Sequence, residues 1–183
     1  TWIPSFLQRS HGMETGEIGT YLGLILGIPG GIGIVLGGYL ADRLGANKKA
    51  WYLWIVSVAL VIAVPPTILV FISNDPYWAL FYFVIPAMLG NFYQATTFSQ
   101  TQGLVSLKMR AVAAAILLFI LNIIGLGLGP QVVGVVSDLL SDRFAEDSLR
   151  YSLLICSFAN LWAAFHYYKA GTFLEADLAR TET

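Results

Sequence analysis

The chain has 183 residues, of which 57% are hydrophobic and only 11% are charged, and its mean hydropathy is +0.71. Soluble domains carry about 25% charged residues, so this composition excludes an ordinary soluble protein and predicts one that lies in a lipid bilayer. The net charge is −1, and no basic patch with interleaved aromatic residues is present, which argues against nucleic acid as a partner. The single cysteine, Cys156, excludes a disulfide bond within the chain.

The first twelve residues, TWIPSFLQRSHG, are apolar only as far as Leu7. Because residue 1 is Thr and not Met, we interpret this segment as the outer end of a helix that begins upstream; no secretory signal is recognisable. Five longer runs without Asp, Glu, Lys or Arg follow, and a helix needs about 20 residues to cross a bilayer. They predict five membrane spans at about 17–41, 50–73, 76–105, 110–138 and 149–169, followed by a cytoplasmic tail at 170–183.

Basic residues indicate on which side of the membrane each connection lies, since Lys and Arg in short loops stay in the cytoplasm. Seven of the ten basic residues follow the first, third and fifth predicted spans: Arg43, Lys48, Lys49, Lys108, Arg110, Lys169 and Arg180. The chain is therefore predicted to begin outside and to end in the cytoplasm. We expect a multi-pass protein of a cell membrane, in particular a bacterial inner membrane.

Proline and glycine recur inside the predicted spans. Each internal proline removes a helix hydrogen bond and bends the helix. These prolines are Pro29, Pro65, Pro66, Pro86 and Pro130. Glycines spaced three or four apart, such as Gly30, Gly33 and Gly37, lie on one helical face and allow a second helix to come close. Asp75 followed by Pro76 predicts a capped N-terminus for the third span.

The polar residues of the membrane region are uncharged and concentrate in the third span. Because the five runs contain no charged residue, the chain offers no proton relay or counter-ion of its own there. At 100° per residue, Asn91, Gln94 and Phe98 share one helical face, which also contains Gln102. Unpaired amides are costly in hydrocarbon, so this face is expected either to line a cavity or to hydrogen-bond to a neighbouring helix. The candidate substrate cavity is formed by Asn91, Gln94 and Phe98, together with Tyr93 and Asn122.

The sequence contains no pattern that predicts catalysis or metal binding. His11 and His166 have no Cys, Asp or Glu at ligand spacing. No serine lies in a Gly-x-Ser-x-Gly context, and the glycines lie in apolar helices and not in phosphate-binding loops. We therefore expect no enzymatic activity, no cofactor and no metal.

The first predicted span ends in GGYLADRLGANKK, where an acid and a base stand side by side between glycines. This stretch resembles motif A of the major facilitator superfamily, Gly-x-Leu-Ala-Asp-Arg-x-Gly followed by basic residues. One departure is that the basic pair is delayed by Ala46 and Asn47. The resemblance implies a conformational gate in which the aspartate meets a helix N-terminus of an opposite half. The gate residues are Gly38, Asp42, Arg43, Gly45 and Lys48.

Residues 91–140 resemble the Spinster-like branch of the same superfamily. They contain a Thr-Gln-x-Leu-Val loop, Met-Arg-Ala, Asn-x-Ile-Gly-x-Gly-x-Gly-Pro and Gly-x-x-Ser-Asp. Anion-transporting branches share the WIPSFL and motif A patterns. The resemblance implies an all-α polytopic membrane protein, namely the C-terminal helical bundle made of the end of helix 7 and helices 8 to 12. The N-terminal six-helix half is absent from this chain.

The function implied by this resemblance is secondary active transport by alternating access. The expected substrate is a small amphiphile, a lysophospholipid or sphingoid-type lipid, with coupling to protons. Two alternatives stay open: a carrier of an organic anion or sugar phosphate, and a non-transporting membrane scaffold or channel subunit. The expected partners are the N-terminal half of the same transporter, the bilayer and the substrate.

Overall fold

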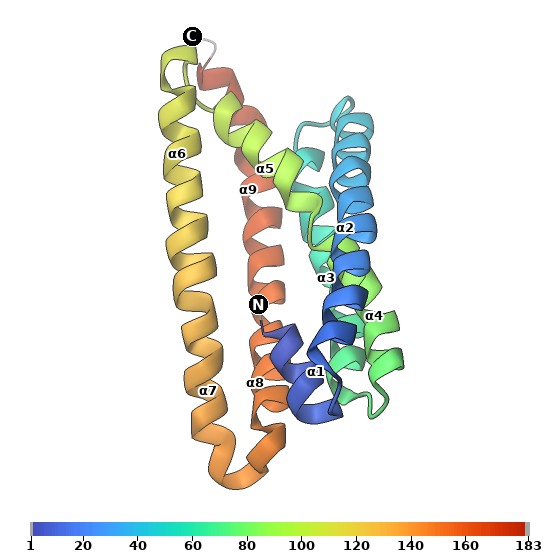
Figure 1. Cartoon of the computed structure of the whole chain (residues 1–183). Helices are drawn as coiled ribbons and strands as arrows, with labels where there is room; N and C mark the ends of the chain where they lie inside the picture. Colours follow the sequence, from blue (N-terminus) through green and yellow to red (C-terminus); the bar gives the residue numbers. More distant parts are fainter. Residues whose placement is uncertain (1, 182–183) are drawn as a thin grey trace.

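The computed structural model describes residues 2–181, and all regular structure in this range is helical (Figure 1). This confirms the predicted all-α fold. Residue 1 and residues 182–183 of the predicted tail lie outside the described residues. In chain order the helices are α1 (Ile3–His11), α2 (Thr15–Gly45), α3 (Trp51–Ile72), α4 (Pro76–Leu89), α5 (Phe92–Gly103), η1 (Leu107–Met109), α6 (Arg110–Ile120), η2 (Leu121–Leu128), α7 (Gly129–Phe144), η3 (Ala145–Asp147), α8 (Ser148–Ser157) and α9 (Ala159–Thr181).

Within residues 2–181, three helical stretches are long and apolar enough to cross a membrane: Thr15–Gly45, Trp51–Ile72 and Leu107–Arg180. The third contains α6 to α9. It reverses direction at η3, so α8 and α9 run back toward the end of the molecule where α6 begins (Figure 1). These helices fit the predicted membrane protein, whereas the boundaries of the five spans stay predictions.

The predicted third span, 76–105, is divided between α4 and α5. The sequence predicts a bend at Pro86, and the structure shows a break a few residues further on. There the Asn91 side chain donates a hydrogen bond of 2.7 Å to the Ala87 carbonyl, the acceptor that the Asn91 N–H would use in a regular α-helix. That N–H turns to the Met88 carbonyl instead, at 3.3 Å. The helix breaks because a side chain competes with the backbone for the same acceptor.

The start of α4 and the end of α9 can both be compared with the sequence prediction. The Asp75 carboxylate accepts two backbone hydrogen bonds, of 2.8 and 3.1 Å, at the start of α4, which confirms the predicted cap. The predicted tail at 170–183 is helical as far as Thr181. Both Gly171 and Leu174 are buried, so this segment packs onto the bundle.

α4 and α5 lie against α2 along a glycine face that we call the glycine seam (Gly30, Gly33 and Gly37). Gly33 is so close to Met88 that an added Cβ atom would overlap the Met88 carbonyl group. A Cβ atom at Gly37 would lie 2.8 Å from the Cα of Phe92. The predicted close approach of a second helix is therefore confirmed at this face. The same spacing predicts it at Gly19, Gly23 and Gly27, where, within residues 2–181, the structure has no neighbouring atom within 4 Å of the Cβ position.

Two clusters of buried hydrophobic residues hold the bundle together. One lies where α1, α2, α3, α4 and α8 meet, and includes Phe6, Phe71 and Leu149. The other lies between α2, α3 and α5, around Val56 and Phe92. The first cluster fixes α1 to one end of the bundle, and the second supports the region of the glycine seam.

α6, η2 and α7 form one continuous column at the edge of the structure (Figure 1). Its middle part, η2, is a π-helix. On α7, the Val133 carbonyl accepts a 2.7 Å hydrogen bond from the Ser152 hydroxyl of α8. The Pro130 carbonyl accepts one of 3.1 Å from the Trp2 indole. The column is thus tied to the rest of the bundle along α7.

Candidate functional site

The break between α4 and α5 lies halfway along α2. Gly30 is the middle residue of Thr15–Gly45, and a Cβ atom added to it would lie 3.2 Å from the Asn91 amide nitrogen. If α2 spans the bilayer, the break is at the depth of the membrane centre. Broken backbone is tolerated at this depth only where it is buried in protein or lines a water-filled cavity.

Two amide side chains meet at this break. The Gln94 amide nitrogen donates a 2.7 Å hydrogen bond to the Asn91 side-chain oxygen, while the Asn91 nitrogen donates to Ala87. Both residues are half-buried. The structure therefore brings together the first two candidate cavity residues. Their remaining donors and acceptors can bind an uncharged polar group, but they carry no charge and no titratable proton.

The other candidate cavity residues lie on two different helices, α5 and η2. Phe98 is half-buried one turn further along α5. Tyr93 packs against the cluster between α2, α3 and α5. Asn122 lies on η2, is exposed, and donates back to the Leu118 carbonyl at 2.7 Å. The structure thus groups Asn91, Gln94 and Phe98 on α5 and leaves Asn122 apart on the column.

The motif A residues gather where α2 ends and α3 begins. A Cβ atom at Gly45 would overlap the Tyr52 ring, so only glycine leaves room for this tyrosine. Asp42 is exposed, and together with Tyr52 it lines a cavity of about 210 Å³ between α2, α3 and α5. Gly38 lines the same cavity, with 3.5 Å between its Cβ position and the Ala95 methyl group.

The basic residues of the motif contact aromatic rings. The Arg43 guanidinium donates to the Tyr39 hydroxyl at 3.4 Å. The Lys48 ammonium lies 4.4 Å from the centre of the Trp54 ring. Among residues 2–181, the structure has no ion pair between Asp42 and either base. The Asp42 carboxylate instead lies within hydrogen-bond reach of the Tyr52 hydroxyl, and as an exposed group without an ion pair it can still bind a partner outside this chain.

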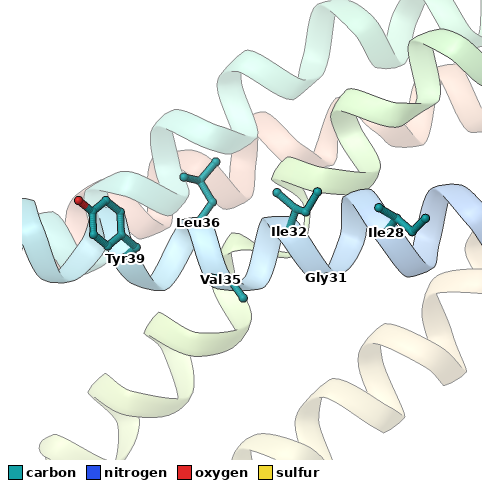
Figure 2. Close-up of a pocket in the computed structure, with 6 residues that line it drawn as sticks. All are labelled: Ile28, Gly31, Ile32, Val35, Leu36 and Tyr39. Atoms are coloured by element: carbon teal, nitrogen blue, oxygen red, sulfur yellow. The ribbon is translucent and has the colours of Figure 1, made fainter.

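An apolar groove runs along the face of α2 opposite the glycine seam (Figure 2). Its volume is about 610 Å³. The lining residues are Ile28, Gly31, Ile32, Val35, Leu36 and Tyr39. Sequence reasoning missed this groove, although large apolar residues at 28, 32, 35 and 39 have the spacing of one helical face.

At the opposite end of the bundle, the pKa of His11 is shifted. Burial lowers the pKa of His11 below its usual 6.5, and the nearby Arg150 lowers it further. A backbone hydrogen bond with Asn74 and the carboxylates of Asp75 and Asp147 oppose this shift. His11 is therefore held in its neutral form near neutral pH.

Comparison with known proteins shows which proteins this chain resembles in sequence and fold. No family model matches the chain. An MFS-type efflux pump of Mycolicibacterium smegmatis (strain ATCC 700084 / mc(2)155) is 34% identical over 179 residues, which are 97% of this chain and 42% of the relative.

Two solved structures have the same fold, and both are of a bacterial homologue of the human lysosomal transporter Spinster. The inward-facing, unoccupied form has a TM-score of 0.82 and 25% identity over 94% of this chain and 43% of that one. The inward-facing, occupied form has a TM-score of 0.77 and 24% identity over 96% and 45%. The chain thus spans less than half the length of these relatives.

An apolar helical bundle with a broken helix opposite the middle of a long span has the architecture of one half of a membrane transporter, and the chain is an integral membrane protein. Over nearly its whole length it is similar to a transporter of the major facilitator superfamily, and its fold is that of a Spinster-like half, as the motifs predict. Its relatives are transporters and not enzymes.

Proposed function

We propose that the chain is the C-terminal half of a secondary transporter that moves a small amphiphile by alternating access. The observation that carries this proposal is the helix break at Asn91, opposite the middle of α2. In many secondary transporters, broken helices near the membrane midplane form the substrate and ion sites, because they expose polar groups there. The efflux pump and the Spinster homologue among its relatives support the same activity.

The side chains beside the break favour an amphiphilic substrate, in particular a lysophospholipid or sphingoid-type lipid. Asn91 and Gln94 offer hydrogen bonds to a headgroup, and Phe98 offers an aromatic surface to a tail. Because this region carries no charge, we assign the headgroup charge and the coupling proton to the N-terminal half. That half is the proposed partner across the substrate cavity.

We also propose the predicted orientation and gate. The lysine-bearing end of α2 and α3 faces the cytoplasm of a bacterial inner membrane, and α1 lies outside. Asp42, which is exposed and has no ion pair among residues 2–181, binds a helix N-terminus of the other half and stabilises the outward-facing state.

Transport by the full-length protein tests the substrate class. Vesicles containing it are given a proton gradient, and uptake of a lysophosphatidylethanolamine is compared with uptake of a sugar phosphate. Gradient-driven movement of the lysolipid alone supports the proposal. Movement of the sugar phosphate alone replaces it with the anion-carrier alternative, and movement of neither substrate in either direction favours a scaffold or channel subunit.

Gln94→Leu tests the cavity directly. Losing one hydrogen bond should raise the substrate concentration for half-maximal transport by about tenfold. Leucine has a similar volume, so the protein should still fold. The matched control is Gln8→Leu, on the exposed surface of α1, which should leave transport unchanged. Equal transport constants in both variants would contradict the proposed role of Gln94.

Cysteine labelling gives an independent measurement of the same site. In a Cys156→Ser background, cysteine at 94 or 98 should react with a water-soluble thiol reagent, and substrate should slow the reaction. If both positions stay inert with and without substrate, Asn91 and Gln94 serve helix packing and the cavity lies elsewhere.

A further inference from the structure

A second cavity lies between α3, α5 and α9, and none of the candidate substrate-cavity residues lines it. Its volume is about 410 Å³, which is within the usual range for small-molecule sites. We call it the α5–α9 pocket. From α3 it is lined by Leu53. The polar residues of its lining are Thr97, Gln100, Thr101, His166 and Tyr167.

The α5–α9 pocket is lined by the side chain of a largely buried glutamine. Gln100 is only 9% exposed, and within residues 2–181 its side chain has no hydrogen-bond partner in the protein. Thr97 and Tyr167, by contrast, satisfy each other through a hydroxyl–hydroxyl hydrogen bond of 2.9 Å. The Gln100 amide is not among the fully buried side-chain atoms without a partner, so it is accessible from the pocket, where a ligand or water can hydrogen-bond to it.

The chemistry of the lining limits what this ligand can be. No Asp, Glu, Lys or Arg lines the pocket, so a charged group would lose its water without gaining a permanently charged partner. The Gln100 amide can both donate and accept, and Thr101 adds a hydroxyl beside it. These groups suit a neutral polar group such as a diol or an amide.

The α5–α9 pocket lies close to Trp54 and Lys48, near the end of the predicted spans. Its lining extends to Ala170, and the next residue, Gly171, lies against the Trp54 ring. Lys48 lies over the same ring, 4.4 Å from its centre. Tryptophan and lysine at a span end mark the level of the lipid headgroups. A lipid bound here would have its headgroup in the pocket and its chain beside apolar helix surface.

We propose that the α5–α9 pocket binds the uncharged headgroup of an amphiphile from the adjacent leaflet, through a hydrogen bond to Gln100. This site is separate from the proposed transport cavity and does not depend on it. A single-chain neutral lipid, such as a monoacylglycerol, has both the diol and the chain that the pocket suits.

Photolabelling of the full-length protein in vesicles tests this site. The probe is a monoacylglycerol with a diazirine in its acyl chain, and cross-links are mapped by mass spectrometry. We expect cross-links on α9 near Ala163 and Ala170, and competition by unlabelled monoacylglycerol. A lysophosphatidate with the same photoreactive chain should label these positions less, because its phosphate finds no lysine or arginine in the pocket.

Variants separate this site from general lipid contact. Gln100→Leu should lower the α9 cross-links by about fivefold to tenfold, the usual effect of losing one hydrogen bond. Gln102→Leu is the matched control, since it makes the same change on the same helix outside the pocket. Ala163→Phe should block labelling by filling the cavity, and the melting temperature of each variant shows that it is folded.

Three results would overturn the proposal. The first is equal α9 labelling in Gln100→Leu and Gln102→Leu, and the second is equal labelling by the neutral and the phosphate probe. The third is an α9 that stays unlabelled in the full-length protein, which would show that another segment of the transporter covers the pocket.

Discussion

The glycine seam and the column of α6, η2 and α7 both contain closely spaced glycines and a proline, yet they pack in opposite ways. In the seam, Gly33 and Gly37 touch the backbone of α4 and α5, leaving no room for a Cβ atom. In the column, Gly125 has no atom within 4 Å of its Cβ position, apart from its own helix backbone. The same sequence signal therefore marks a fixed contact in one region and an open surface in the other.

This difference has a mechanical consequence. The seam makes α2, α4 and α5 move as one unit, because their backbones are in contact. The column contains a π-helix, Leu121–Leu128, of which most residues are exposed, and π-helices inside α-helices are frequent at functional sites. If the chain pairs with the proposed second half, we expect the column to be the part that adjusts to it and the seam to be the rigid part.

The largest effect should come from filling the seam. Gly33→Ala places a methyl group on the Met88 carbonyl, and backbone cannot move aside cheaply, so we expect a loss of about 3 kcal/mol in unfolding free energy. Gly125→Ala on the column is the matched control and should be neutral or stabilising by up to about 1 kcal/mol. Unfolding of both variants in detergent measures this difference, and equal stabilities would show that the two glycine faces do not differ.

Asp42→Asn tests whether the seam unit moves. If Asp42 holds the outward-facing state, its loss should shift the conformational equilibrium about tenfold toward the inward-facing state, a change of about 1.4 kcal/mol. Distances between spin labels on the cytoplasmic ends of the two halves measure the shift. Arg43→Gln should do less, because Arg43 bonds to Tyr39 of its own helix. An unchanged distance distribution with lost transport would leave Asp42 a folding residue.

Much of this fold could be predicted because membrane helices leave strong signals in composition and charge. The Asp75 cap and the close approach at Gly30, Gly33 and Gly37 follow from local chemistry, and the structure confirms them. The helix break could be predicted only as a bend at Pro86. The position of the break depends on the Asn91 side chain, which hydrogen-bonds to a carbonyl of its own helix and not to a neighbouring helix. Tertiary packing decides between these two partners.

The candidate site was less predictable than the fold. Periodicity placed Asn91 and Gln94 on one face, and the structure joins them by a hydrogen bond. Tyr93 shows the limit of the method, because its packing against the α2–α3–α5 cluster depends on how α5 crosses α2. The buried amide of Gln100 was missed for the same reason, since burial of one glutamine among several follows only from the position of α9.

A smaller effect should come from untying the column. Ser152 is fully buried, and its hydroxyl donates to the Val133 carbonyl of α7 at 2.7 Å. Ser152→Ala should cost about 1 kcal/mol in unfolding free energy, the usual net value of one hydrogen bond. Ser141→Ala is the control: this exposed serine bonds within α7 to Asp138, and its loss should cost less than about 0.5 kcal/mol. Similar losses in both variants would mean that the tie to α8 does not hold the column.

The smallest effect should be a pH dependence at the proposed outer end, where α1 packs against α3 and α8. His11 lies edge-on to Phe6, with 5.1 Å between the ring centres, and burial followed by Arg150 lowers the pKa of His11 below 6.5. The unfolded chain takes up this proton near pH 6.5, whereas the folded chain takes it up only at lower pH. Between these values the unfolded state binds more protons, so stability falls as the pH drops below about 6.5. His11→Gln should flatten this slope in thermal unfolding measured from about pH 7.5 to about pH 5, whereas His166→Gln should retain it. If the slope survives in His11→Gln, another group at the outer end carries the pH dependence, and α1 is not held by the neutral form of His11.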